Sequence, residues 1–99
     1  MENALFIVTA IVNPANAQEL PGYQAQAMES IKAHGGSPVS RFKTVESLSG
    51  DDSPEMVAVM TFPSAQDIKD MINSEAFQAL NDLRAKVFSK LNMMISESL

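Results

Sequence analysis

Two stretches of the chain are apolar at nearly every position, and this feature restricts most strongly how the chain can fold. Residues 4–12 read ALFIVTAIV and residues 55–62 read EMVAVMTF. Both are short and rich in branched, aromatic or thioether side chains, so we predict two strands, with Asn13-Pro14 ending the first. Neighbouring side chains of a strand point to opposite faces of its sheet. Both strands therefore need apolar surroundings on each face.

The segments that follow these strands have helical spacing. Apolar residues recur every three or four positions from Leu20 to His34, which predicts a helix over this range. Pro21 marks its first turn, and the Gly35-Gly36 pair ends it.

A second helical region follows residues 55–62. Ser64 is its predicted N-cap, and Asp67 three residues later completes a weak form of the capping box. The apolar stripe changes phase at Asn73-Ser74, so we expect two helices or a kink there, with Ser74 capping the second part.

The remaining segments complete an alternating order of strands and helices. Residues 39–48 are a mixed β-rich segment, residues 50–54 have dense turn chemistry, and residues 91–95 read as a short last strand. The order β-α-β-β-α-β predicts an α+β, ferredoxin-like fold, with a four-stranded antiparallel sheet and helices on one face. We expect the first and third strands at the centre and the other two at the edges. The 99 residues are expected to form one domain, residues 1–99.

This arrangement leaves one face of the sheet without helices, although both central strands are apolar on that side too. About half a dozen medium-sized side chains would lie there, each worth roughly 1.5–3 kcal/mol when buried. Their exposure would forfeit on the order of 10 kcal/mol, which is comparable to the whole stability of a typical domain. We therefore predict a homodimer in which two sheets pack face to face.

Charge and composition narrow the range of partners and locations. Twelve acidic against seven basic side chains give a net charge of −5, which disfavours nucleic acid as a partner. The chain has no cysteine, which fits a reducing cytosol. The apolar run at residues 4–12 follows Glu2 without Lys or Arg and is too short to span a bilayer. We expect no secretory signal, no membrane partner and a cytoplasmic location.

Three longer stretches carry a family resemblance. GYQAQAMESIKAHGGSPVSRF, FPSAQDIKDMINSEAFQALNDLRAKVF and KLNMMISE resemble, in order and spacing, a small bacterial domain-of-unknown-function family of the dimeric α/β-barrel superfamily. The resemblance implies the ferredoxin-like fold and its pairing into a dimeric α/β barrel. It implies no single activity, because that superfamily includes cofactor-independent monooxygenases, isomerases, haem-degrading enzymes and small-molecule sensing domains. Met71-Ile72 and Ser49-Gly50 depart from the family pattern.

Arg84 is the first of four candidate ligand-binding residues. It lies on an apolar stripe, four residues after Leu80 and four before Phe88. A buried guanidinium needs anionic or carbonyl partners. Arg84 therefore either packs its stem and pairs with a carboxylate at the rim, which we favour, or binds an anionic ligand.

The other three candidates also have structural alternatives. Tyr23 either donates a hydrogen bond into a cavity between sheet and helices or packs in the core. His34, the only histidine, is either a general base or ligand, or a residue that favours a helix C-terminus; we prefer the latter. Arg41 either contacts a ligand or protects an edge strand from aggregation.

Thioether and acidic side chains are the remaining candidates for binding sites. Four methionines on or near the predicted strands either line a pocket for a flexible apolar ligand or, more simply, fill the core: Met56, Met60, Met93 and Met94. Asp51, Asp52 and Glu55 lack the spacing of a calcium loop and read as a solvated turn. A lone histidine makes a poor metal site. We expect no metal and no cofactor.

Three functions are compatible with these observations. The first is a module that binds a small, partly apolar or anionic molecule between sheet and helices. The second is a cofactor-independent monooxygenase or isomerase that uses His34, Tyr23 or Arg84, and the third is a structural interaction module. An enzyme needs two titratable groups at one cavity and the sequence has one histidine, so the binding module is preferred. No signature of dinucleotide, nucleotide, serine-hydrolase or zinc-protease sites occurs.

Overall fold

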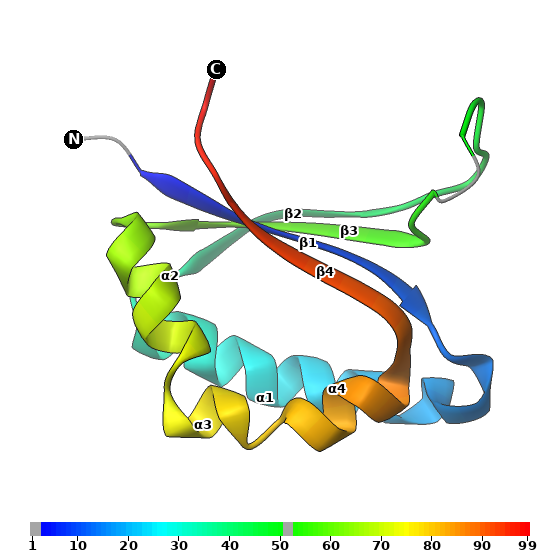
Figure 1. The fold of residues 1–99 in the computed structure, drawn as a ribbon, viewed down its shortest axis with the longest axis horizontal. Helices are drawn as coiled ribbons and strands as arrows, with labels where there is room; N and C mark the ends of the chain where they lie inside the picture. The colour runs from blue at the N-terminus through cyan, green and yellow to red at the C-terminus, as the bar shows by residue number, and fades with distance from the viewer. Residues whose placement is uncertain (1–2, 51–52) are drawn as a thin grey trace.

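The computed structural model describes residues 3–50 and 53–99, which form one sheet with helices on one of its faces (Figure 1). Glu2, Asp51 and Asp52, which entered the sequence arguments, lie outside the described residues. The elements are β1 (Ala4–Val12), the 3-10 helix η1 (Pro14–Glu19), α1 (Leu20–Ala33), β2 (Ser37–Lys43), β3 (Met56–Phe62), α2 (Ala65–Ile72), α3 (Glu75–Gln78), α4 (Asn81–Val87) and β4 (Phe88–Ser96). The predicted β-α-β-β-α-β order and the α+β class are confirmed.

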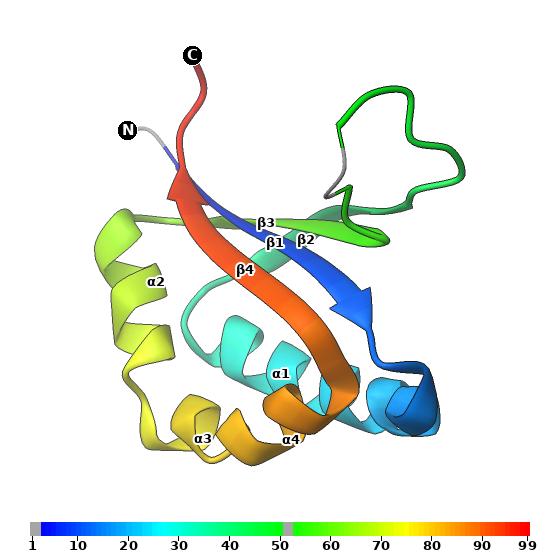
Figure 2. The same cartoon turned by 45° about the vertical axis from the view of Figure 1, so that its right-hand side comes forward.

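The sheet is antiparallel and has the strand order β2-β3-β1-β4, which confirms the central position of the first and third strands. Phe6 of β1 lies opposite Met60 of β3 on one side and opposite Ile95 of β4 on the other. Figure 2 shows the helices packed together beneath this sheet. Side chains of one strand alternate between the helix-covered face and the open face.

Both predicted helix caps are present in the second helical region. The Ser64 side chain accepts a hydrogen bond from the backbone N–H of Asp67 at 3.2 Å, and α2 begins directly after it. The Ser74 hydroxyl accepts one from the backbone N–H of Phe77 at 3.3 Å, where α3 begins. The phase change at Asn73-Ser74 is therefore a break between two helices.

The end of α1 follows from the local chemistry of His34-Gly35-Gly36. The backbone N–H of Gly36 donates to the Ile31 carbonyl at 2.8 Å and that of Gly35 to the Lys32 carbonyl at 3.1 Å. This pair of hydrogen bonds is the Schellman motif, and Gly35 has the positive φ of 82° that the motif requires. Gly36 is also restricted by packing, since a Cβ there would lie 2.6 Å from the Phe62 ring.

The structure differs from the predicted segments in three places. Strand β2 covers Ser37–Lys43 instead of residues 39–48, because β3 supplies partners only as far as Met56 opposite Lys43. Strand β4 starts at Phe88 instead of residue 91, because the long β1 continues to pair with it as far as Val12. The region after Ser74 also contains a further break between α3 and α4.

The core fills the space between the sheet and the helices in two adjoining clusters. One contains Phe6, Ile31, Met60, Phe62, Ile68, Met71 and Phe77, and the other contains Ala10, Tyr23, Ala27, Leu80, Val87 and Phe88. The opposite face of the sheet, called the open face below, also bears apolar side chains that are only partly buried or exposed: Leu5, Ile7, Ile11, Phe42, Val57, Val59 and Met94.

Residues 3–50 and 53–99 contain neither a helix suited to span a membrane nor a group of potential metal ligands. None of the helices there combines the length and the apolar composition needed to cross a membrane. In the same part of the chain, no three His, Cys, Asp or Glu side chains gather as they would around a metal ion.

Candidate functional site

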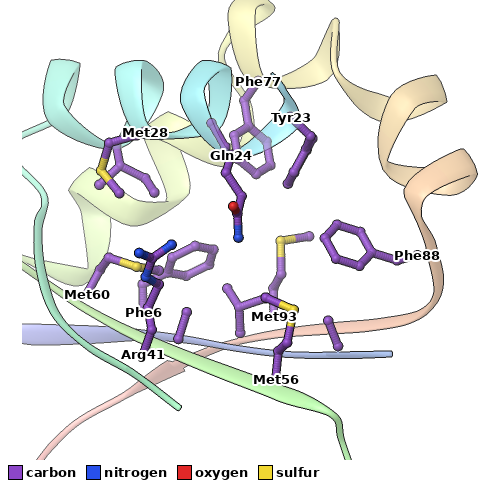
Figure 3. Close-up of a pocket in the computed structure, with 15 residues that line it drawn as sticks. Phe6, Tyr23, Gln24, Met28, Arg41, Met56, Met60, Phe77, Phe88 and Met93 are labelled. Carbon is purple, nitrogen blue, oxygen red and sulfur yellow. The ribbon is translucent and has the colours of Figure 1, made fainter. Parts of the chain in front are cut away.

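A cavity of about 100 Å³ lies between the helix-covered face of the sheet and α1 (Figure 3). Strands β1, β3 and β4 form its floor, while α1 and α3 form its roof. Its lining is dominated by apolar side chains: Phe6, Val8, Ala10, Tyr23, Ala27, Met28, Ile31, Met56, Ala58, Met60, Phe77, Phe88 and Met93. Every second side chain of β1 and β3 points to this face of the sheet. Apolar side chains of α1 that recur every three or four positions cover them.

Two polar side chains, Gln24 and Arg41, complete the cavity lining. Gln24 points from α1 toward the sheet, and Arg41 points from β2 toward the helices (Figure 3). Arg41 takes this direction because it pairs with Ala58, whose side chain also lines the cavity. Neither side chain has a hydrogen-bond or ion-pair partner among the residues that the structure describes. Arg41 is exposed and Gln24 half-buried, so the cavity opens to solvent beside them.

Arg84 lies behind the cavity wall and is only 7% exposed. Its Nη2 donates to the Phe77 carbonyl and to Asn81 Oδ1, both at 2.6 Å, and its Nη1 donates to the Tyr23 hydroxyl at 3.4 Å. The partners are neutral oxygens and not the carboxylate that we favoured from the sequence. The break between α3 and α4 explains this difference, because it places the Phe77 carbonyl within reach of the guanidinium.

Tyr23 connects Arg84 to the cavity. Its ring lines the cavity and meets the Phe88 ring edge to face, with centroids 5.4 Å apart. Its hydroxyl accepts the hydrogen bond from Arg84, so both ends of the side chain are held. The guanidinium of Arg84 also stacks on the Phe77 ring, 4.1 Å from its centroid. Two aromatic rings thus separate a buried positive charge from the cavity.

His34 lies away from this cavity. It follows the last residue of α1, and its Nδ1–H donates to the Ser30 carbonyl at 2.9 Å. The ring faces a groove between α1 and α3 that Glu29 and Ser74 also line. Tyr23 and Arg41 are therefore the two predicted site residues that line the cavity; Arg84 contacts it through Tyr23 and Phe77, and His34 is separate.

Gln24 was not among the site residues predicted from the sequence. This residue lies four positions after Leu20 and three before Ala27, so helical spacing places it on the stripe that faces the sheet. A polar residue on that stripe was the available signal. Among the methionines, Met56, Met60 and Met93 do line the cavity together with Met28, whereas Met94 pairs with Ile7 and lies on the open face.

Several solved structures share this fold. A protein of unknown function from Rhodopseudomonas palustris has a TM-score of 0.82 at 15% identity, over 99% of this chain and 83% of that chain. A DABB family protein with a ferredoxin-like fold from Mesorhizobium loti has a TM-score of 0.72 at 12% identity, over 100% and 99% of the two chains. A Nitrosomonas europaea protein with the provisional name antibiotic biosynthesis monooxygenase has a TM-score of 0.72 at 15% identity, over 99% and 91%. At these identities the similarity establishes the fold alone.

Sequence comparison is more specific about the family. No curated protein matches the chain. The family described as Domain of unknown function (DUF1330) matches residues 4–99, which is almost the whole chain. This match agrees with the resemblance noted in the sequence. The chain therefore belongs to the family Domain of unknown function (DUF1330).

Proposed function

We propose that the protein is a homodimeric module whose subunits each bind one small, partly apolar molecule in the cavity between sheet and helices. One observation carries the ligand-binding part: a mostly apolar cavity opens to solvent beside two polar side chains, Gln24 and Arg41, that lack partners among the described residues. Apolar pockets with a few convergent polar groups are the usual form of small-molecule sites. A cytoplasmic location is part of this proposal and rests on the absence of cysteine.

The open face supports the dimer. It carries the apolar side chains named above, while all helices lie on the other side of the sheet (Figure 1). A sheet face of this composition is expected to pack against another sheet at a spacing of about 10 Å. A second copy offers the same apolar face, so a two-fold axis would cover both faces at once.

The segment after β2 gives independent support for the dimer. Residues 44–50 leave the sheet on the side opposite the helices (Figures 1 and 2). Val45 is 92% exposed and Leu48 is 90% exposed on this segment. Because the segment lies on the open side of the sheet, two such segments in a dimer would flank the paired sheets.

Light scattering coupled to size-exclusion chromatography tests the assembly. The wild type should have twice the chain mass of 10.7 kDa. Ile7→Glu places a charge in the centre of the open face and should give a species of one-chain mass, because burying an unpaired carboxylate is costly. Ala25→Glu, on the exposed side of α1, is the control and should remain dimeric. A monomeric wild type would refute the dimer.

A cavity-filling variant tests the ligand site. Ala58 lies on the cavity floor, so Ala58→Leu should fill part of the volume and weaken binding of small apolar ligands in a thermal-shift screen. Ala85→Leu on the exposed surface of α4 is the control and should behave as the wild type. Equal ligand responses from all three proteins would contradict the site.

An enzymatic function is the second candidate. The fold similarity to the Nitrosomonas europaea protein brings it into consideration, but it concerns the fold alone. Acid–base catalysis needs titratable groups that converge on the reacting molecule. Among the described lining residues, the titratable side chains are those of Tyr23 and Arg41, and the Tyr23 hydroxyl accepts a hydrogen bond from Arg84. His34 faces another groove. Binding without turnover is therefore the function that this geometry supports best.

A further inference from the structure

We infer that the ligand class is a small monocarboxylate with a short apolar chain, whose carboxylate contacts Arg41 and Gln24 while its chain enters the cavity. This inference rests on the proposed ligand site and specifies its chemistry. It depends on three features of the described residues: the charges around the cavity, the small number of polar groups at its mouth, and the methionine side chains of its lining.

The charges around the cavity favour an anion. No Asp or Glu side chain among the described residues lines it, whereas the guanidinium of Arg41 lies at its mouth and that of Arg84 lies behind Phe77 and Tyr23. Neither guanidinium has a carboxylate within ion-pair distance in residues 3–50 and 53–99. This local excess of positive charge occurs in a chain whose net charge is −5. Because the wall is apolar, solvent screens the interaction of both charges with a bound anion less than it would at the open surface.

The polar groups at the mouth match a headgroup with two oxygens. A guanidinium presents paired N–H donors in a planar fork that fits a carboxylate. The Gln24 amide can add one more donor. The Tyr23 hydroxyl accepts a hydrogen bond from Arg84 and keeps its own O–H, which is the only other side-chain donor among the described lining residues. A phosphate has a higher charge and more acceptor oxygens than a carboxylate, so it would need more donors than the described side chains at this mouth present.

The cavity lining fits a flexible chain of a few carbons. Four methionines, Met28, Met56, Met60 and Met93, contribute unbranched thioether side chains that adapt to different shapes. The cavity volume of about 100 Å³ is smaller than the roughly 150 Å³ of an apolar cavity that encloses one benzene molecule. The carboxylate would remain at the open mouth, so the enclosed space has to hold only the chain.

Isothermal titration calorimetry of the 99-residue chain with hexanoate, hexanamide and hexyl phosphate tests this inference. The three probes share one chain and differ in their headgroup. We expect hexanoate to bind on the order of 10- to 100-fold more tightly than hexanamide, which corresponds to a charge-assisted hydrogen bond. Hexyl phosphate should bind more weakly than hexanoate.

Two variants test which residue recognises the headgroup of the ligand. Arg41→Ala should remove the preference for hexanoate over hexanamide, because it weakens the binding of the charged headgroup more than that of the neutral one. Lys43→Ala is the matched control, because Lys43 lies two residues further along the same strand, pairs with Met56 and does not line the cavity. It should keep the full preference. Circular dichroism should show the wild-type fold for both variants, since both positions are exposed.

The outcomes separate this inference from the proposed function. Equal affinities for hexanoate and hexanamide, tighter binding of hexyl phosphate, or an Arg41→Ala variant that keeps the hexanoate preference would overturn the carboxylate class and leave the ligand site standing. Failure of all three probes to bind at millimolar concentration would overturn both the carboxylate class and the proposed ligand site.

Discussion

The guanidinium of Arg84 stacks on the Phe77 ring at 4.1 Å from its centroid and donates a 2.6 Å hydrogen bond to the carbonyl of the same residue. One side chain of α4 thus holds both the ring and the backbone of α3. Since Phe77 and Tyr23 form part of the cavity wall, this contact fixes the side of the cavity that faces the second helical region.

Arg84→Ala should lower the free energy of unfolding by about 2–3 kcal/mol, because it removes three hydrogen bonds and the stacking on Phe77. Arg84→Lys should recover only part of this loss, since an ammonium group lacks the planar fork. Urea denaturation measures both values. The control is Lys86→Ala, which removes an exposed ion pair with Glu19 and should cost about 1 kcal/mol or less. An Arg84→Ala variant as stable as Lys86→Ala would contradict the structural role.

Alanine substitution should change the stability in opposite directions at Gly22, which lies within α1, and at Gly36, which follows it. Gly36→Ala should destabilise the fold by about 1–3 kcal/mol, because the new Cβ would lie 2.6 Å from both Ile31 and Phe62. Gly22 lies in α1, and a Cβ added there would meet nothing within 4 Å, so Gly22→Ala should stabilise by up to about 1 kcal/mol. Thermal unfolding followed by circular dichroism would show the two shifts. A Gly36→Ala variant as stable as the wild type would refute the packing argument at Gly36.

Ser74 has two roles at the junction of α2 and α3. Its hydroxyl accepts from the Phe77 N–H and donates to the Met71 carbonyl at 2.6 Å. Ser74→Ala should therefore cost about 1 kcal/mol in chemical denaturation, the usual value for an N-cap. Ser98→Ala, beyond the end of β4, should have no measurable effect. If the two variants have the same stability, the cap at Ser74 does not contribute to folding.

Local chemistry explains why much of this fold could be predicted. The bounds of β1, the start of α1 at Leu20 and the caps at Ser64 and Ser74 depend on residues close together in the chain, and all were predicted correctly. The break between α3 and α4 involves the hydrogen bond of Arg84 to the Phe77 carbonyl, which becomes visible only once both helices are placed. The end of β2 depends on where β3 begins, and the sequence pattern of residues 39–48 does not show that position.

The candidate site was harder to predict than the fold. Tyr23 and Arg41 were named from their types and positions, and both line the cavity. Gln24 was overlooked because an amide on a helix is usually assigned to the solvent side. The orientation of His34 could not be predicted, because the direction of a residue just after a helix depends on how the chain turns there, and its ring caps α1 outside the cavity. Their roles in binding stay predictions.

The methyl NMR signals of methionine test the proposed ligand site most directly, because the seven methionines sample different parts of the molecule. With methyl-labelled protein assigned through single Met→Leu variants, titration with hexanoate should shift the signals of Met28, Met56, Met60 and Met93, which line the cavity. The signal of Met94 on the open face should stay in place. Unchanged cavity signals at hexanoate concentrations where calorimetry detects binding, or a shift of Met94 alone, would contradict the proposed site.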